Sequence, residues 1–174
     1  VGAVNVPVTV KIRTGVDRAQ VNGVEISRIA AESGVRAIAV HGRTRADFYE
    51  GAAEYESIRE VCAAAAIPVI ANGDIDNAEK AAAVLEFTRA AAVMIGRGAH
   101  GAPWIFRDVN AFPEKGKIPP PLLRTEIRDI ILEHITALYA FHGETNGVRI
   151  ARKHLGWYCQ QHTDTGIFRP QLMA

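Results

Sequence analysis

Seven residues at or near the ends of apolar segments carry groups from which a site for an anionic ligand could be built. They are Lys11, His41, Asn72, Gly73, Asp74, Gly96 and Arg97. Glycine lets a backbone approach a phosphate closely, and arginine adds a bidentate charged contact. Asn72-Gly73-Asp74 or Gly96-Arg97-Gly98 alone is typical of an ordinary turn. Two such segments after successive apolar runs favour phosphate binding at helix N-termini.

Lys11 and His41 each allow a chemical and a structural interpretation. A lysine on the inner face of an apolar strand is costly unless it meets an anion. A flavin is one such partner, because a cation near its N1–C2=O edge stabilises the reduced anion; a salt bridge to Asp74 is the structural alternative. A lone histidine is often structural, but the following Gly42-Arg43-Thr44-Arg45 favours a phosphate or substrate contact.

The two cysteines and six histidines predict neither thiol nor metal chemistry. Cys62 and Cys159 lie in apolar helical stretches and are expected to be packed, unreactive thiols, not a disulfide framework. No group of histidines and cysteines has the spacing of metal ligands. We therefore predict no catalytic residue and no metal site in this chain.

A repeated pattern positions the seven residues. Apolar, strand-like segments occur at residues 8–12, 37–41, 68–72 and 92–96, with amphipathic stretches between them. This alternation predicts successive βα units and a parallel sheet. Asp76 and Glu79 have the spacing of a capping box for the third helix.

The fold class predicted is α/β, as the C-terminal half of a (β/α)8 TIM barrel followed by a small all-α domain. Four units could also form an open doubly wound sheet. A complete barrel needs roughly 200 residues or more, and the chain has 174. The half barrel is favoured because the polar residues fall on one side of the strands, at the end where barrels carry their chemistry.

The chain changes character after residue 109. We assign residues 1–109 to the half barrel, 110–123 to a Pro-rich linker and 124–174 to a helical domain that is truncated. The helical domain is expected to contain a long helix, a turn at Gly143 and Gly147, and a second helix over residues 148–161. Arg149, Arg152 and Lys153 share a face of that second helix; they are typical of a solvated surface or of a phosphate-backbone contact.

Bulk properties restrict the class of protein. The net charge of +1 does not by itself indicate a nucleic-acid binder. No apolar run reaches the roughly 18–20 residues that a membrane helix needs, and no signal peptide opens the chain. It begins at Val1 without Met, so the true N-terminus is expected elsewhere. We expect a cytoplasmic protein.

Several segments together resemble the tRNA-dihydrouridine synthase family, most closely its bacterial B-type branch. The segments are residues 10–15 (VKIRTG), 41–45 (HGRTR), 67–75 (IPVIANGDI), 94–98 (MIGRG), 103–106 (PWIF) and 149–154 (RIARKH). They occur in the family's order and cover nearly the whole chain, so that the chain corresponds to the C-terminal half of a family member.

The resemblance implies an FMN-dependent barrel that uses NADPH to reduce uridine to 5,6-dihydrouridine in tRNA. It implies FMN binding by the seven residues named first. RNA binding is assigned to Arg43, Arg45, Arg149, Arg152 and Lys153. The first half of the barrel is missing, with the cysteine that donates a proton, so the fragment alone is expected to be inactive and the full-length protein a monomer.

Two other functions remain open from the sequence. One is a different FMN-dependent barrel oxidoreductase that acts on a small substrate; the basic helical tail is against it. The other is a non-catalytic half barrel that serves as a binding or assembly module. Its open sheet edges predict a dimer that completes the barrel.

Overall fold

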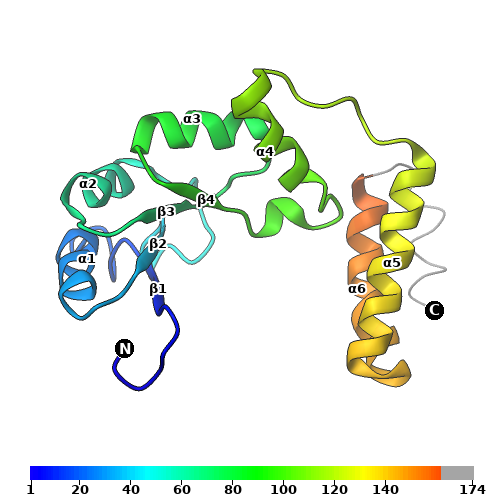
Figure 1. The fold of residues 1–174 in the computed structure, drawn as a ribbon, viewed down its shortest axis with the longest axis horizontal. Helices are drawn as coiled ribbons and strands as arrows, with labels where there is room; N and C mark the ends of the chain where they lie inside the picture. The colour runs from blue at the N-terminus through cyan, green and yellow to red at the C-terminus, as the bar shows by residue number, and fades with distance from the viewer. Residues whose placement is uncertain (162–174) are drawn as a thin grey trace.

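Four parallel strands form the sheet of this chain. The structure is a computed structural model that describes residues 1–161, apart from the side chains of residues 113–115. The strands lie in the order β1 (Thr9–Arg13), β2 (Ala37–His41), β3 (Val69–Asn72) and β4 (Ala92–Met94), as Figure 1 shows. The parallel sheet predicted from the sequence is confirmed, although β1 ends one residue later and β4 two residues earlier than predicted.

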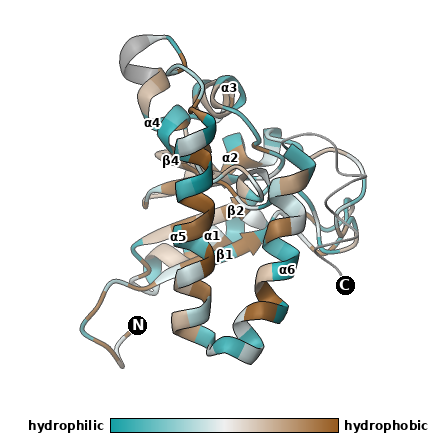
Figure 2. Cartoon of the chain, turned by 90° about the vertical axis from the view of Figure 1, so that its right-hand side faces the viewer, coloured by the Kyte–Doolittle hydropathy of each residue, from teal (hydrophilic) through white to brown (hydrophobic). Residues whose placement is uncertain are grey.

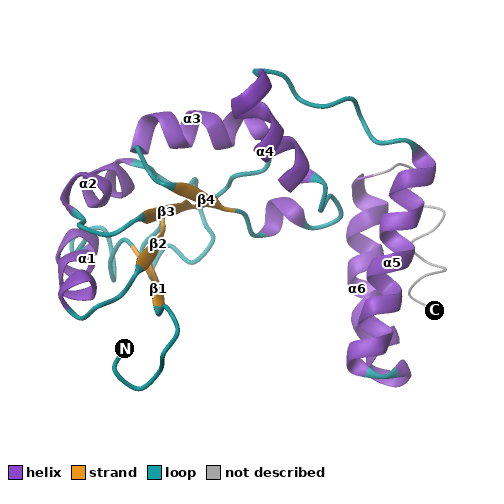
Figure 3. Ribbon diagram, in the orientation of Figure 1, coloured by secondary structure: helices purple, strands orange, loops and turns teal. Residues whose placement is uncertain are grey.

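Three helices cover one face of the sheet: α1 (Gly23–Glu32), α2 (Glu56–Ala64) and α3 (Ala78–Thr88), seen beside the strands in Figure 3. The branched side chains of alternate strand residues point toward these helices and form the core. The strand residues of this core are Ile38, Val40, Val69 and Ala71, and the partly buried Val10, Ile12 and Val93 pack against it. Residues of the opposite parity, Lys11 among them, therefore lie on the inner face of the sheet.

The first turn of α3 differs from the prediction. The N-cap residue is Asn77, whose side-chain oxygen accepts a hydrogen bond from the Lys80 backbone N–H at 2.7 Å. The expected capping box between Asp76 and Glu79 is therefore wrong. Asp76 instead accepts a hydrogen bond from the Asn77 side chain at 3.0 Å. Asn and Asp cap helices about equally well, so the path of the backbone decides which of the two residues does so.

The chain continues from β4 through a 3-10 turn, η1 (Arg97–Ala99), to α4 (Ile105–Lys115), α5 (Arg124–His142) and α6 (Glu144–Gln161). Helix α4 extends into the predicted linker, so the irregular part of residues 110–123 starts at Gly116, where the backbone is left-handed (φ +60°). Helix α6 begins earlier than the predicted residue 148, because only Gly143 forms the turn while Gly147 is helical. Residues 162–174 of the predicted helical domain lie outside the described residues.

Helices α5 and α6 form an antiparallel pair, and α6 contacts the segment that follows β4. Both helices carry hydrophobic and hydrophilic residues along their length, as Figure 2 shows. The Trp157 ring on α6 stacks on His100 with 3.7 Å between ring centroids. A Cβ added at Gly101 would lie 2.3 Å from the Trp157 carbonyl oxygen, so the two backbones touch. No helix within residues 1–161 is long and apolar enough to cross a bilayer.

Candidate functional site

The strand register brings inner-face residues into one row at the C-terminal edge of the sheet. Arg13 lies opposite His41, His41 opposite Asn72, and Asn72 opposite Met94. Lys11 lies opposite Ala39, one inward position before the row. The prediction that polar residues share one side of the sheet is consistent with this register, although Arg13 and not Lys11 is level with His41.

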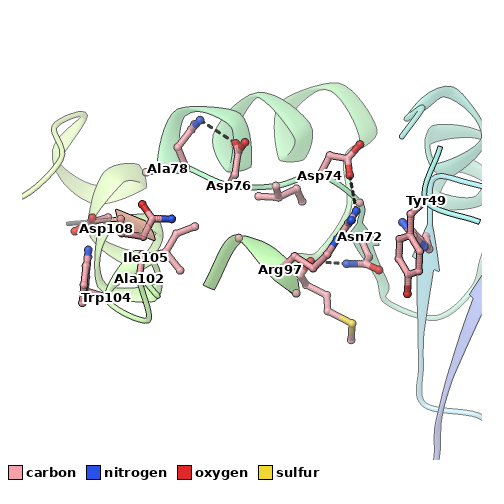
Figure 4. Close-up of a pocket in the computed structure, with 18 of the residues that line it drawn as sticks. Tyr49, Asn72, Asp74, Asp76, Ala78, Arg97, Ala102, Trp104, Ile105 and Asp108 are labelled. Atoms are coloured by element: carbon pink, nitrogen blue, oxygen red, sulfur yellow. Dashed lines mark hydrogen bonds and ion pairs between the residues drawn. The ribbon is translucent and has the colours of Figure 1, made fainter. Parts of the chain in front are cut away.

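A pocket of about 720 Å³ opens above this row. All seven residues that the sequence nominated for cofactor binding line it: Lys11, His41, Asn72, Gly73, Asp74, Gly96 and Arg97. Figure 4 shows Arg97, Asn72 and Asp74 together, with Tyr49 on one side and Trp104, Ile105 and Asp108 on the other. This volume is within the roughly 300–1,000 Å³ of small-molecule sites. The lining combines cations, glycines and apolar side chains, which suits an anionic ligand with a flat apolar part.

Asp74 connects three segments of the pocket wall. Its carboxylate accepts hydrogen bonds from Arg43 Nη1 at 2.9 Å and Nη2 at 2.6 Å, and from the Ala53 backbone N–H at 2.8 Å. Arg97 Nη2 lies 3.5 Å from the same carboxylate. Partial burial acts to raise the pKa of Asp74, but the bonds from Arg43 and Ala53 outweigh it and lower the pKa. The carboxylate is therefore ionised at neutral pH, and its partners are arginines, not Lys11.

Arg43 lies inside the protein, contrary to the RNA-binding role predicted for it. Its side chain is 3% exposed. Besides Asp74, its guanidinium donates to the backbone carbonyls of Glu50 at 3.2 Å and Gly51 at 2.7 Å. These partners occupy the guanidinium, so it is not available to an RNA phosphate in this structure. The other four residues proposed to bind RNA, Arg45, Arg149, Arg152 and Lys153, are exposed.

His41 is a buried, neutral histidine at the pocket. Its residue exposure is 8%. Burial lowers the pKa of His41 to about 4, and the positive charges of Lys11, Arg13 and Arg43 act in the same direction against Asp74. The pKa of Lys11 is also lowered, by partial burial and then by the charge of Arg13. His41 can thus offer hydrogen bonds without adding a further positive charge to the site.

Tyr49 lines the pocket and Arg13 supports it, although the sequence did not single out either residue. The Tyr49 ring contacts two guanidiniums, with Arg13 Cζ 5.4 Å and Arg97 Cζ 4.6 Å from its centroid. Arg13 also donates to the backbone carbonyls of Thr44 at 2.7 Å and Phe48 at 2.8 Å. Arg13 therefore fixes the loop that carries Tyr49. Arg13 follows Lys11 by two residues and so lies on the same face of the strand, which was the one feature of the sequence that could have identified it.

The glycines of the two nominated turns have different roles. A Cβ at Gly73 would lie 2.6 Å from the Ala53 Cβ and 3.1 Å from the His41 ring, and φ is +132°. Gly73 is therefore required by packing and by its backbone. A Cβ at Gly96 would meet no atom within 4 Å, although Gly96 lines the pocket. The space beside the Gly96 backbone is open to a ligand.

Neither cysteine lines the pocket. Cys62 packs against the core under the sheet, where burial raises the pKa of its thiol. Cys159 lies on α6 and is a half-buried free thiol. Within residues 1–161, no three His, Cys, Asp or Glu side chains converge as metal ligands would.

Known proteins match the chain over nearly its whole length. The family model of dihydrouridine synthase (Dus) matches residues 1–174. The chain is 55% identical over 169 residues to tRNA-dihydrouridine synthase B of Vibrio cholerae, covering 97% of this chain and 52% of the relative. It is 56% identical over 169 residues to tRNA-dihydrouridine synthase B of Xanthomonas axonopodis pv. citri, with 97% and 51% covered. The chain thus spans about half the length of the curated relatives it matches. It belongs to the dihydrouridine synthase family, where its similarity is to the B-type branch.

Proposed function

We propose that the protein containing this chain reduces uridine to 5,6-dihydrouridine in tRNA, with FMN as cofactor and NADPH as reductant. The observation that carries the proposal is the convergence of seven nominated residues on one pocket, in a chain of this family. The names of the relatives support uridine in tRNA as the substrate. Because the chain spans about half of those relatives, the activity is proposed for the whole protein.

The residues present fit FMN. Lys11 and Arg97 supply positive charge at the pocket, and the open space beside Gly96 would admit a phosphate against the backbone. Met94, Ile75 and Ile105 supply apolar surface for a flat ring. Charge and apolar surface occur on the same pocket wall, which a ligand with a phosphate and an aromatic ring requires.

Each residue then has a definite task. Lys11 binds the ring of the cofactor as a cation, and Gly96 and Arg97 hold the phosphate, with Gly73 nearby. His41 and Asn72 orient the cofactor by hydrogen bonds, while Asp74 keeps Arg97 in place through their 3.5 Å ion pair. Bound FMN, once reduced, supplies the hydride. The cysteine proton donor that the family resemblance implies is expected in the remainder of the protein.

The architecture proposed for the whole protein follows from the open inner face of the sheet. Residues 1–109 form the C-terminal half of a (β/α)8 barrel whose other half covers that face, and the complete barrel is a monomer. Residues 110–123 lead to a helical RNA-binding domain that starts at residue 124. We propose that the exposed Arg45, Arg149, Arg152 and Lys153 contact tRNA and that the protein acts in the cytoplasm.

The cofactor assignment is tested in the full-length protein by Lys11→Ala, with the exposed Lys117→Ala as control. We expect Lys11→Ala to slow single-turnover formation of dihydrouridine in unmodified tRNA by at least tenfold, because the variant lacks the cation proposed to contact the ring. Mass spectrometry of digested tRNA measures the product. An unchanged rate in Lys11→Ala would exclude the proposed role of Lys11.

The phosphate assignment is tested by Gly96→Val, because its side chain enters the open space beside the backbone. The variant is expected to retain less FMN after purification, as measured by flavin absorbance per protein, while its helix content by circular dichroism stays unchanged. Equal flavin content in the variant and the parent would contradict the phosphate site.

The isolated 174-residue chain is expected to form no dihydrouridine with NADPH and tRNA.

A further inference from the structure

The guanidinium of Arg43 contacts His41 as well as Asp74. Arg43 Nη1 lies 3.4 Å from His41 Nε2 and 2.9 Å from Asp74 Oδ1. Asp74 and the carbonyls of Glu50 and Gly51 hold the guanidinium from three other directions. Arg43 is therefore fixed in position before any ligand enters the pocket that His41 and Asp74 line.

The chemistry of the two groups decides the direction of this contact. An arginine side chain has only donors and stays protonated in proteins. The partner atom, His41 Nε2, must accept with its lone pair, and a neutral imidazole then carries its proton on Nδ1. The alternative tautomer would direct an N–H of the ring at an N–H of the guanidinium.

We propose that Arg43 is a positioning residue that holds His41 in the neutral tautomer with the proton on Nδ1. Nδ1–H is then the ring group that donates to an anionic or carbonyl oxygen of a pocket ligand, while no charge is added. That the ligand is a flavin rests on the proposed function; the tautomer itself rests on the geometry alone.

The surroundings of His41 are consistent with a neutral ring. The charged groups that act on it are Lys11 and Arg13 from β1, Arg43 from the loop after β2, and Asp74 from the turn after β3. Three of these four are cations, so a protonated His41 would be repelled by more neighbours than attract it.

The test is a two-bond ¹H–¹⁵N correlation spectrum of the histidine rings in the full-length, ¹⁵N-labelled protein at pH 7. The signals of His41 are identified by their disappearance in His41→Asn. We expect Nδ1 at the shift of a protonated nitrogen and Nε2 at the shift of an unprotonated one. The opposite assignment, or a ring protonated on both nitrogens, would overturn the proposal even if no Arg43 variant folds.

Arg43→Met removes the guanidinium donors and keeps an unbranched apolar side chain. In this variant the His41 Nε2 signal is expected to move toward the protonated shift, because the tautomer is no longer imposed. Arg18→Met is the control: Arg18 pairs with Asp47 on the same loop, but its side chain is 84% exposed. It should leave both signals in place. Unchanged His41 signals in a folded Arg43→Met protein would contradict the role of Arg43.

Flavin absorbance of the same samples separates the two proposals. A parent protein without flavin but with the Nδ1–H tautomer would contradict the proposed function and support the role of Arg43. A parent protein with flavin but with the Nε2–H tautomer would support the proposed cofactor and contradict the role of Arg43.

Discussion

The carboxylate of Asp74 is held at a turn that its own backbone does not favour. Asp74 has φ +48°, directly after Gly73 at +132°. The left-handed region costs most non-glycine residues about 1–2 kcal/mol, and aspartate less, because its short polar side chain can bond locally. Arg43 and the Ala53 backbone N–H offset this cost by binding both oxygens of the carboxylate. Removal of the carboxylate would leave the buried guanidinium of Arg43 without its only anionic partner among the described residues.

Asp74→Ala is therefore expected to lower the free energy of unfolding by about 3 kcal/mol, the usual scale for breaking a buried ion pair. The matched control is Asp129→Ala, because both members of the Arg128–Asp129 pair are exposed and such pairs contribute about 0–1 kcal/mol. Urea unfolding of the full-length variants measures both values. Equal effects of the two substitutions would show that the Arg43–Asp74 pair does not stabilise the fold.

The low pKa of His41 predicts a loss of stability in acid. Unfolded histidine has a pKa near 6.5, whereas folded His41 has a pKa of about 4. Below pH 6.5 the unfolded chain binds the proton first, so the free energy of unfolding falls until the pH passes about 4. His41→Asn should flatten this dependence between pH 6.5 and 4. Urea unfolding at several pH values in that interval measures the dependence. If the free energy of unfolding changes with pH equally in parent and variant, His41 makes no contribution.

Residue types alone do not show which arginine is buried. Arg43 and Arg45 stand two positions apart in one motif, yet Arg43 lies inside and Arg45 outside. The difference comes from Asp74, 31 residues further on, and from two carbonyls that the loop conformation brings close. Tyr49 was missed for the same reason, because its contacts with Arg13 and Arg97 depend on the path of the loop after β2.

At the level of elements, the spacing of apolar residues predicted the strands and the buried face of the sheet. Alternating branched residues identify the strands and the face that α1 to α3 cover, because a strand buries every second side chain. The start of α3 was missed because Asp76 and Asn77 are both good caps, and the positive φ angles of Gly73 and Asp74 set the direction of the chain before them. The contact between Gly101 and α6 could not be predicted, because it joins Gly101 to Trp157, which lies far away in the sequence.

Gly101 offers a test of that contact. It has φ +73°, and a Cβ would lie 2.3 Å from the Trp157 carbonyl oxygen. Gly101→Ala is expected to cost more than the about 1–2 kcal/mol of a left-handed alanine and to raise hydrogen exchange in α6. Gly116→Ala is the matched control, because Gly116 has φ +60° and open space around it. The contact is unimportant if both substitutions lower the free energy of unfolding equally and leave α6 equally protected.

At the scale of the molecule, the proposed RNA-binding residues lie on α6, which reaches the pocket only at its last residue, Gln161. Arg149→Ala, Arg152→Ala and Lys153→Ala combined should reduce the slope of log affinity for tRNA against log salt by roughly one unit for each phosphate that the variant no longer binds. Flavin content should not change. Filter binding at several salt concentrations measures the slope.

The control for this experiment removes the same charge elsewhere. Arg28, Arg36 and Arg59 are exposed on the part of the chain that contains α1 and α2. Their combined substitution by Ala lowers the net charge equally but should leave the slope nearly unchanged. If both triple variants show the slope of the parent, the three residues of α6 do not contact RNA phosphates.

One short stretch of chain, residues 96–104, contacts both the pocket and α6, and Gln161 at the end of α6 lines the pocket as well. Gly96 and Arg97 line the pocket at its start, and His100 and Gly101 contact Trp157 of α6 only a few residues later. A movement of the backbone at Gly96 would be transmitted to the residues that contact α6, because so few residues separate them. Binding events at the two places would then be linked, and linkage is reciprocal. If a ligand in the pocket changes the affinity of α6 for its own ligand by some factor, the ligand of α6 changes the affinity of the pocket by the same factor.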